Sequence, residues 1–203
     1  MKNYFGGRQP SHYHMNYIVK AFIMSEGFFW SGYNFVFPIL SIFVVEQIVG
    51  GTIELAATAV SAYMISRVIT ELLTGKILEG QKDQKKLKMS IAGITIVAIA
   101  YFSFSFINQP IWVYVLQGVI GIGLGIASPA KYSLFAQHLN KKRSSNEWSV
   151  YDAVTFIGMA LSSALGGFIA HQYGFAVLFK ISGVMIFLGT LPYIFTYHFI
   201  EKN

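Results

Sequence analysis

The sequence predicts an all-α membrane protein with six transmembrane helices. Of its 203 residues, 54% are hydrophobic and only 12% are charged, against roughly 25% charged residues in soluble domains. The mean hydropathy is +0.53, and most of the charged residues lie between long apolar stretches. Stretches of this kind indicate that lipid surrounds the helices.

Six stretches are long enough to cross a membrane, because a helix needs about 20 apolar residues to span the hydrocarbon core. The predicted spans are approximately 20–45, 53–77, 88–107, 111–137, 150–171 and 175–199. A helix also satisfies its own backbone hydrogen-bonding groups, which lipid cannot do. Residues 1–16 are polar and aromatic and are predicted to form a cytoplasmic segment without a cleaved signal peptide.

The basic residues predict the orientation of the spans. The connections after the first, third and fifth spans contain no Lys or Arg, whereas the other connections and both chain ends are basic. The positive-inside rule then places both termini in the cytoplasm, in what we expect to be a bacterial plasma membrane. The same cytoplasmic basic residues account for the net charge of +6. We therefore expect no nucleic-acid partner.

The chain contains no cysteine, which excludes disulfide bonds and thiolate metal sites. Nothing in the sequence leads us to expect a metal or a cofactor.

The first span carries a carboxylate followed by polar and aromatic residues at helical spacing: Glu26, Trp30, Tyr33 and Asn34. This face could line a substrate cavity or take up a proton. The alternative is that Glu26 lies close enough to the interface to reach headgroup water. Pro38 allows a kink further along the span.

The second span carries Arg67 and Glu71, which share a helix face because they are four residues apart. One interpretation is a buried pair facing the bundle interior, in a gate or proton path. The other is a structural ion pair near the cytoplasmic interface. Gln117 is a polar residue deep in the fourth span. Lys131 and Asp152, near the cytoplasmic ends of the fourth and fifth spans, could pair.

Glycines in two spans predict close helix packing, because small residues four apart let helix backbones approach. These glycines are Gly121, Gly123, Gly125, Gly158, Gly166 and Gly167. Gly75 and Gly167 also open similar turns three helices apart, which would fit a 3+3 inverted repeat.

These features together resemble the N-terminal half of a major facilitator superfamily transporter. The family's first signature follows the second span, where Gly75, Glu79, Lys85 and Lys86 take the glycine, acidic and basic positions. In the fourth span, Gln117 stands where the family has arginine, and Gly121 and Gly123 match. In the fifth span, Gly166 and Gly167 match the glycine pair of its signature.

The resemblance implies a six-helix half bundle that moves a small solute by alternating access, with protons as a candidate coupling ion. It also implies that the loop at Gly75–Lys86 braces against a second six-helix bundle, either another copy or a separate chain. Lys131 and Asp152 are further candidates for that gating region. The aromatic first span would suit an amphipathic or aromatic solute.

Two other function classes remain open at this point. The chain could be a non-transporting membrane module for assembly or sensing. A remote alternative is a rhomboid-like serine protease, because Ala170–Gly174 matches the AHxxG pattern around His171. No GxSG accompanies that pattern, and Ser128 is predicted near the opposite side of the membrane, so we do not expect an enzyme.

Overall fold

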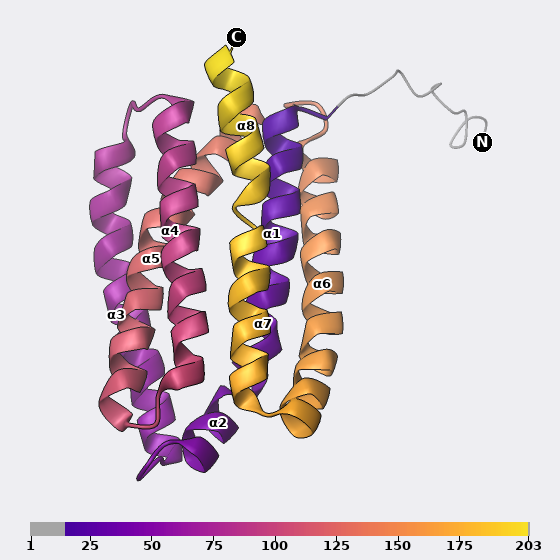
Figure 1. Ribbon diagram of the computed structural model, residues 1–203. Coiled ribbons are helices and arrows are strands. Elements are labelled where there is room, and N and C mark those ends of the chain that lie inside the picture. Colours follow the sequence, from indigo (N-terminus) through magenta and orange to yellow (C-terminus); the bar gives the residue numbers. More distant parts are fainter. Residues whose placement is uncertain (1–14, 203) are drawn as a thin grey trace, which may run out of the picture.

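The computed structural model describes residues 15–202, which form helices joined by short connections (Figure 1). The helices are α1 (Tyr17–Val36), α2 (Leu40–Gln47), α3 (Ile53–Leu78), α4 (Asp83–Ser103), α5 (Pro110–His138), α6 (Ser144–Tyr173), α7 (Phe175–Leu188) and α8 (Leu191–Lys202), with 3-10 turns η1 (Phe37–Ile39) and η2 (Phe104–Phe106). They make six membrane-spanning segments, α1 continuing into α2 and α7 into α8. The predicted fold class is confirmed. The predicted cytoplasmic segment 1–16 lies outside the described residues, except for Met15 and Asn16.

The helix ends follow from local sequence signals. The side chain of Asn16 accepts a hydrogen bond from the Ile18 amide and caps α1 (2.8 Å), and Thr52 caps α3 in the same way. Pro110 opens α5, where its missing amide hydrogen costs nothing. Gly174 has a φ of 84°, which permits the tight turn between α6 and α7.

Several helices extend beyond the stretches that hydropathy marks as spans. α4 begins at Asp83 rather than near residue 88, and α6 begins at Ser144 rather than near residue 150. Both extensions are polar first turns. Hydropathy locates the part of a helix that lies in lipid, whereas the backbone continues as a helix into the interfacial region.

Two of the six segments are interrupted. The first breaks at η1, where Pro38 removes a backbone donor. The sixth breaks between Leu188 and Leu191, and Pro192 lies in the first turn of the helix that follows. The Ser25 hydroxyl donates to the Gly189 carbonyl at this second break (2.6 Å) and ties it to α1. Only the first interruption was expected from the sequence.

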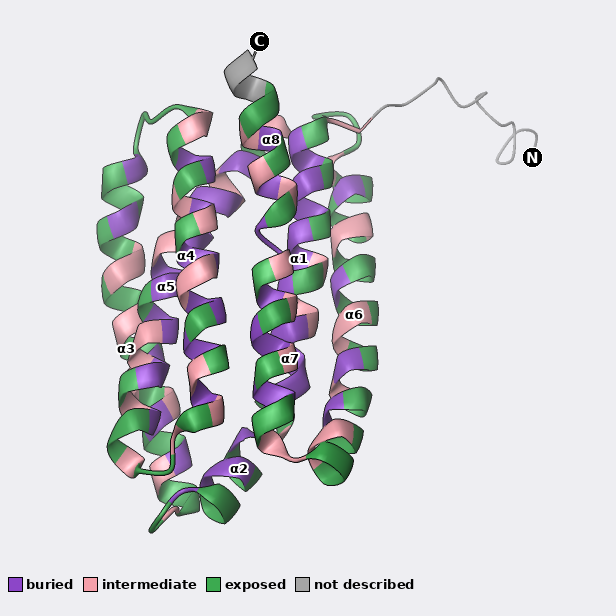
Figure 2. Ribbon diagram, viewed as in Figure 1, coloured by how far each residue is buried: buried purple, intermediate pink, exposed green. Residues whose placement is uncertain are grey.

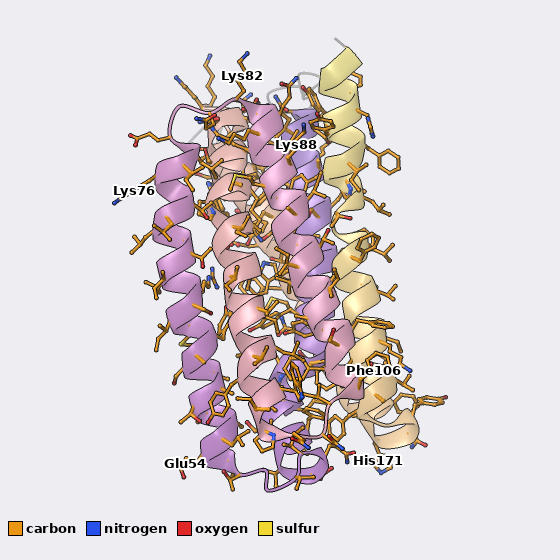
Figure 3. The ribbon with its side chains drawn as sticks, turned by 60° about the vertical axis from the view of Figure 1, so that its left-hand side comes forward. Glu54, Lys76, Lys82, Lys88, Phe106 and His171 are labelled. Carbon is orange, nitrogen blue, oxygen red and sulfur yellow. The ribbon has the colours of Figure 1, made fainter. Side chains whose placement is uncertain are left out.

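The two ends of the bundle differ in charge. The described chain begins and ends at the upper end in Figure 1, where the α3–α4 and α5–α6 connections also lie. We call this the basic end, because those connections hold Lys82, Lys141, Lys142 and Arg143. The opposite end, which we call the neutral end, holds the connections that lack Lys and Arg. Figure 3 shows Lys76, Lys82 and Lys88 at the basic end, and Glu54 and His171 at the neutral end.

The helices pack as two groups of three. α3, α4 and α5 form one group, α1, α6 and α7 form the other, and α4 meets α7 between them. In a 3+3 repeat the first span corresponds to the fourth, the second to the fifth and the third to the sixth. The contact of the first span with the fifth (α1–α6) then corresponds to that of the fourth with the second (α5–α3). In the same way, α1–α7 corresponds to α5–α4. This correspondence is the packing expected of a 3+3 repeat.

The core lies along α1 and α5 (Figure 2). Half of the span in each of these segments is buried, against 17% in α3 and α6. Several of the largest fully buried side chains are aromatic, among them Phe22, Phe29, Phe135 and Tyr193. α3 and α6 therefore present most of their side chains outward, to lipid or to a partner.

Glycines set the separation of the packed helices at a few positions. A Cβ atom on Gly121 would overlap the Tyr63 carbonyl of α3, and one on Gly166 would overlap the Phe35 carbonyl of α1. Gly123, Gly125 and Gly158 also face neighbouring helices closely. Gly167 departs from the packing prediction, because no described atom of a neighbouring helix lies within 4 Å of its Cβ position. It faces away from the helix that Gly166 contacts.

Candidate functional site

A buried ion pair joins α1 to α5. Lys131 Nζ lies 2.6 Å from Glu26 Oε1, and both side chains are 0% exposed. Glu26 lies about 13 Å of helix rise from the start of α1, and Lys131 about 10 Å from the end of α5, so the two groups meet at the same depth. Glu26 therefore does not reach water in this structure, although its sequence position allowed that interpretation.

Aromatic groups complete the surroundings of this pair. The Trp30 indole donates from Nε1 to Glu26 Oε2 (3.0 Å), so each carboxylate oxygen has its own partner. The Lys131 ammonium lies 4.7 Å from the ring centre of Phe29 and 5.4 Å from that of Tyr132. Cation–π contacts of this kind stabilise an ammonium that has left water.

The predicted pairing of Lys131 with Asp152 is not what the structure shows. Asp152 is exposed on α6, whereas Lys131 points inward to Glu26. Sequence spacing placed both residues near the basic end of their helices. It could not tell which face of α5 would meet α1, because that depends on how the helices pack.

A second ion pair lies within α3. Arg67 Nε is 3.2 Å from Glu71 Oε2, and the two side chains are 27% and 39% exposed. Arg67 also donates from Nη1 to the Tyr63 hydroxyl (2.9 Å) and from Nη2 to Ser128 Oγ on α5 (3.4 Å). The fork of the guanidinium thus ties α3 to α5.

One segment of α5 touches both pairs. Ser128 and Lys131 lie about one turn apart, the first facing Arg67 and the second facing Glu26. Pro129 stands between them and has no amide hydrogen, so the Gly125 carbonyl lacks its usual helical partner. Because this segment contacts α1 and α3 at once, a shift of it would change the Glu26–Lys131 pair and the Arg67–Ser128 contact together.

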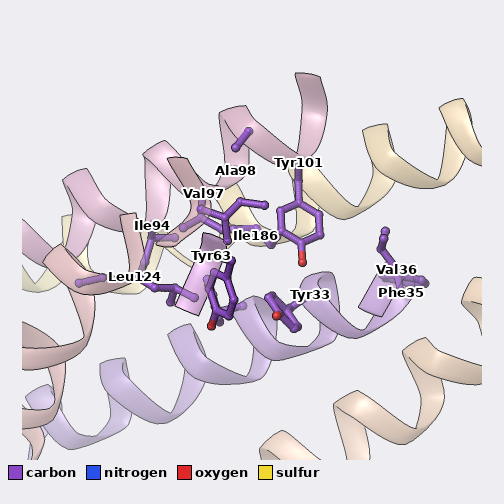
Figure 4. Packing of buried hydrophobic residues seen from close by; sticks show 14 of the residues in the cluster. Tyr33, Phe35, Val36, Tyr63, Ile94, Val97, Ala98, Tyr101, Leu124 and Ile186 are labelled. Carbon is purple, nitrogen blue, oxygen red and sulfur yellow. The ribbon is translucent and has the colours of Figure 1, made fainter. Parts of the chain in front are cut away.

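Tyrosine rings continue the site toward the neutral end. Figure 4 shows Tyr33, Tyr63 and Tyr101 close together, from α1, α3 and α4. The Tyr33 ring centre lies 5.5 Å from that of Trp30 and 5.7 Å from that of Tyr101. Trp30 and Tyr33 therefore link the buried ion pair to a tyrosine cluster between the helices.

Two predicted polar residues do not join the ion pairs. The Asn34 side chain donates to the Trp30 carbonyl of its own helix (3.0 Å), so its donor is used locally. Gln117 is buried on α5, but it lies about 16 Å of helix rise from Ser128. It belongs to the neutral half of the bundle.

The residues of the predicted gating loop separate into two kinds. Gly75, Glu79 and Lys85 are exposed, whereas Lys86 is buried and donates to Gln137 Oε1 of α5 (2.9 Å). His138 Nε2 and Asp83 Oδ2 make a further contact between α4 and α5 (3.2 Å). Lys86 thus braces this bundle internally, and only the exposed residues are open to a partner.

Three contributors to the site were missed from the sequence. Tyr63 and Tyr132 contact the two cations, and the sequence pointed to Ser128 only as the nucleophile of the protease alternative. Tyr63 had a signal, since it precedes Arg67 by one helical turn. Tyr132 follows Lys131 directly, and no spacing rule would have paired neighbours on a helix.

Ser128 and His171 are not arranged as a catalytic pair. Ser128 is buried, lies about 27 Å of helix rise from the start of α5, and accepts from Arg67. His171 is exposed at the neutral end (Figure 3). A serine nucleophile requires a base within hydrogen-bond reach, so this geometry does not support the protease alternative.

The family model of the Major Facilitator Superfamily matches residues 22–202. The chain is 25% identical over 166 residues to a proton-coupled antiporter flippase of Staphylococcus epidermidis, covering 82% of this chain and 41% of that protein. It is 28% identical over 116 residues to dipeptide and tripeptide permease B of Aliivibrio fischeri, covering 56% and 23%. A gallate transporter of Pseudomonas putida is 28% identical over 137 residues, covering 65% and 28%.

The chain spans less than half the length of these relatives. The six apolar helices make it an integral membrane protein. With the family match over nearly all of the described residues, the chain belongs to the Major Facilitator Superfamily.

Proposed function

We propose that this chain is a six-helix half of a secondary transporter, which moves a small solute by alternating access and uses the Glu26–Lys131 pair to couple that movement to protons. The observation that carries the proposal is the complete burial of this pair between α1 and α5. Relatives named as a proton-coupled antiporter, a peptide permease and a gallate transporter support it. The basic end faces the cytoplasm of a bacterial plasma membrane.

The chemistry of the pair suits a proton-dependent latch. Two buried opposite charges stabilise each other only while both are present, because each alone would lack both water and a counterion. Protonation of Glu26 neutralises the carboxylate and leaves the Lys131 ammonium without its anion. The ammonium can then attract an anionic group of the solute. Departure of the proton restores the pair and displaces that group.

Further solute contacts that we propose lie on the partly exposed pair of α3. Arg67 and Glu71 retain access to the surface of the bundle, and Tyr63 stands beside them. A guanidinium, a carboxylate and aromatic rings favour an amphipathic or aromatic solute that carries a charged group.

A second six-helix bundle, from another copy or a separate chain, is the partner that we propose. The outward-facing α3 and α6 would contact it in the membrane. Glu79 and Lys85, exposed at the basic end, would contact its helix ends.

The test is transport by the reconstituted chain, alone and with candidate partner bundles. Proteoliposomes with an imposed pH gradient should accumulate solute, and Glu26→Gln should abolish accumulation while leaving exchange of labelled for unlabelled solute. Exchange needs no net proton movement, so its survival separates coupling from folding. Glu46→Gln, which removes an exposed carboxylate of α2 outside the proposed solute contacts, is the matched control and should still accumulate solute.

Two results would contradict the proposal. Equal accumulation by Glu26→Gln and the unsubstituted chain would show that this carboxylate does not couple protons. No gradient-driven flux in any assembly would favour a non-transporting membrane module.

A further inference from the structure

An apolar groove follows α1 from the basic end toward the middle of the bundle. It consists of two hollows of about 410 Å³ and 460 Å³. The first lies between α1 and α8 and the second between α1, α6 and α7. Met24 and Phe28 line both hollows, so the two adjoin along α1, and we refer to them together as the groove.

The length of the groove matches one membrane leaflet. Along α1 its lining runs from Tyr17 to Ser31, which at 1.5 Å per residue is about 21 Å, and the part beyond Lys20 is about 16 Å. The hydrocarbon core of a bilayer is about 30 Å thick, so one leaflet contributes about half of that. A groove of this length fits an acyl chain that lies along the helix.

The charge in the groove lies where a lipid headgroup would be. Lys20 is exposed at the basic end of the groove. Helix side chains lean toward the helix N-terminus, so the Lys20 ammonium points out of the hydrocarbon. It pairs with no carboxylate of residues 15–199.

Two hydroxyl groups of the lining are used within their own helices. Ser31 donates to the Gly27 carbonyl (2.6 Å), and Thr196 donates to the Pro192 carbonyl (2.8 Å). The remaining lining is almost entirely apolar. Lys20 and the Tyr17 hydroxyl are therefore the polar groups that the groove offers to a ligand, and Lys20 is the charged one.

We propose that the groove binds an anionic phospholipid of the leaflet at the basic end, with its phosphate at Lys20 and an acyl chain along Met24 and Phe28. This inference does not depend on the proposed transport function. A single lysine and a leaflet-long apolar groove match a lipid better than the surface of a second copy, which would need a larger complementary face.

The position of the groove gives the bound lipid a structural consequence. Leu188 lines it just before the break in the sixth segment, and Leu191 and Pro192 line it just after. A lipid chain in the groove contacts both α7 and α8. Lipid binding would therefore favour the present angle between them.

The test uses lipid quenching of a tryptophan placed in the groove. Phe195 lines the groove and is 71% exposed, so Phe195→Trp should fold normally. The chain is reconstituted in nanodiscs, and quenching added by this tryptophan is compared for brominated phosphatidylglycerol and brominated phosphatidylcholine. One lysine at the headgroup level predicts a preference of about fivefold for phosphatidylglycerol.

Substitutions identify the source of that preference. In Lys20→Gln the two lipids should quench almost equally, whereas Lys20→Arg should keep the preference for phosphatidylglycerol. Lys76→Gln removes an exposed lysine at the basic end of α3, outside the groove, and should leave the preference unchanged. Equal quenching by both lipids, or an equal loss in Lys76→Gln and Lys20→Gln, would overturn the proposal. Crosslinks from residue 195 to a second copy would show that protein occupies the groove instead.

Discussion

The two ion pairs of the bundle contain the same kinds of charge in opposite settings. Glu26 and Lys131 join two helices and are completely buried, whereas Arg67 and Glu71 lie one turn apart on one helix and are partly exposed. The first pair exists only if α1 and α5 pack in the present register. The second requires only that α3 be a helix. Tertiary packing therefore creates the first pair, and helix geometry alone creates the second.

This difference separates two uses of charge in a membrane protein. A buried pair has lost its water, so removal of one member leaves an uncompensated charge in a medium of low dielectric constant. A partly exposed pair keeps some water, and each member tolerates the loss of the other. The buried pair is thus suited to a two-state latch, and the exposed pair to contact with a solute.

The largest effect is expected when the buried pair loses one member. Glu26→Gln or Lys131→Met should each lower the free energy of unfolding by about 3–5 kcal/mol, because the remaining charge is stranded. The double variant should recover most of that loss. Unfolding of the purified protein in detergent, followed by circular dichroism, measures all three. A double variant as unstable as the two single losses added together would show that the residues do not act as a pair.

A smaller effect is expected when the contact between α3 and α5 is opened without touching the buried pair. A Cβ on Gly125 would meet Thr70 and the backbone of Arg67 and Glu71, so Gly125→Ala should cost about 1–3 kcal/mol through overpacking. Gly118→Ala on the same helix has no neighbour within 4 Å, and should be stabilising by up to about 1 kcal/mol. The same unfolding experiment distinguishes them, and equal effects would contradict the close packing.

Removal of Arg67 should change stability little and solute binding more. Arg67→Met leaves Glu71 partly exposed to water, so the cost in stability should be at most about 1 kcal/mol. Under the proposed function, the apparent affinity for solute should fall clearly in uptake assays. Arg67→Lys keeps the positive charge but loses the planar guanidinium, so its apparent affinity for solute should lie between those of Arg67→Met and the unsubstituted chain. A large stability loss with unchanged uptake would reverse the roles assigned to the two pairs.

The smallest effect concerns salt. Glu71→Gln should lower the free energy of unfolding by about 0.3–0.5 kcal/mol at low ionic strength. The difference should shrink toward 1 M salt, where the screening length is about 3 Å. The effect of Glu26→Gln should not depend on salt, because water and ions do not reach that pair. Unfolding in detergent at low and high sodium chloride compares them, and equal salt sensitivity would argue against the burial of Glu26.

Much of the fold could be read from the sequence because it rests on local rules. Apolar length predicted the six segments, since about 20 residues are needed to cross a bilayer. Pro38 predicted a kink in the first segment for the same local reason, and the helix is interrupted there. The break near Gly189 was missed, although Pro192 stands just beyond it. From the sequence alone, a proline that begins a new helix cannot be distinguished from a proline inside a continuous span. The distinction requires knowing that α7 ends at Leu188.

In the candidate site, contacts within one helix could be predicted from the sequence, and contacts between helices could not. The sequence by itself determined that Arg67 and Glu71 share a face, and that Trp30 follows Glu26 by one turn, because the helical period fixes both relations. Only the tertiary structure decided that Lys131 meets Glu26 rather than Asp152, that Ser128 reaches Arg67, and that Lys86 turns inward to Gln137. These contacts join residues from different helices. Their formation depends on the rotation and register of packed helices, which glycine contacts and side-chain volumes set jointly.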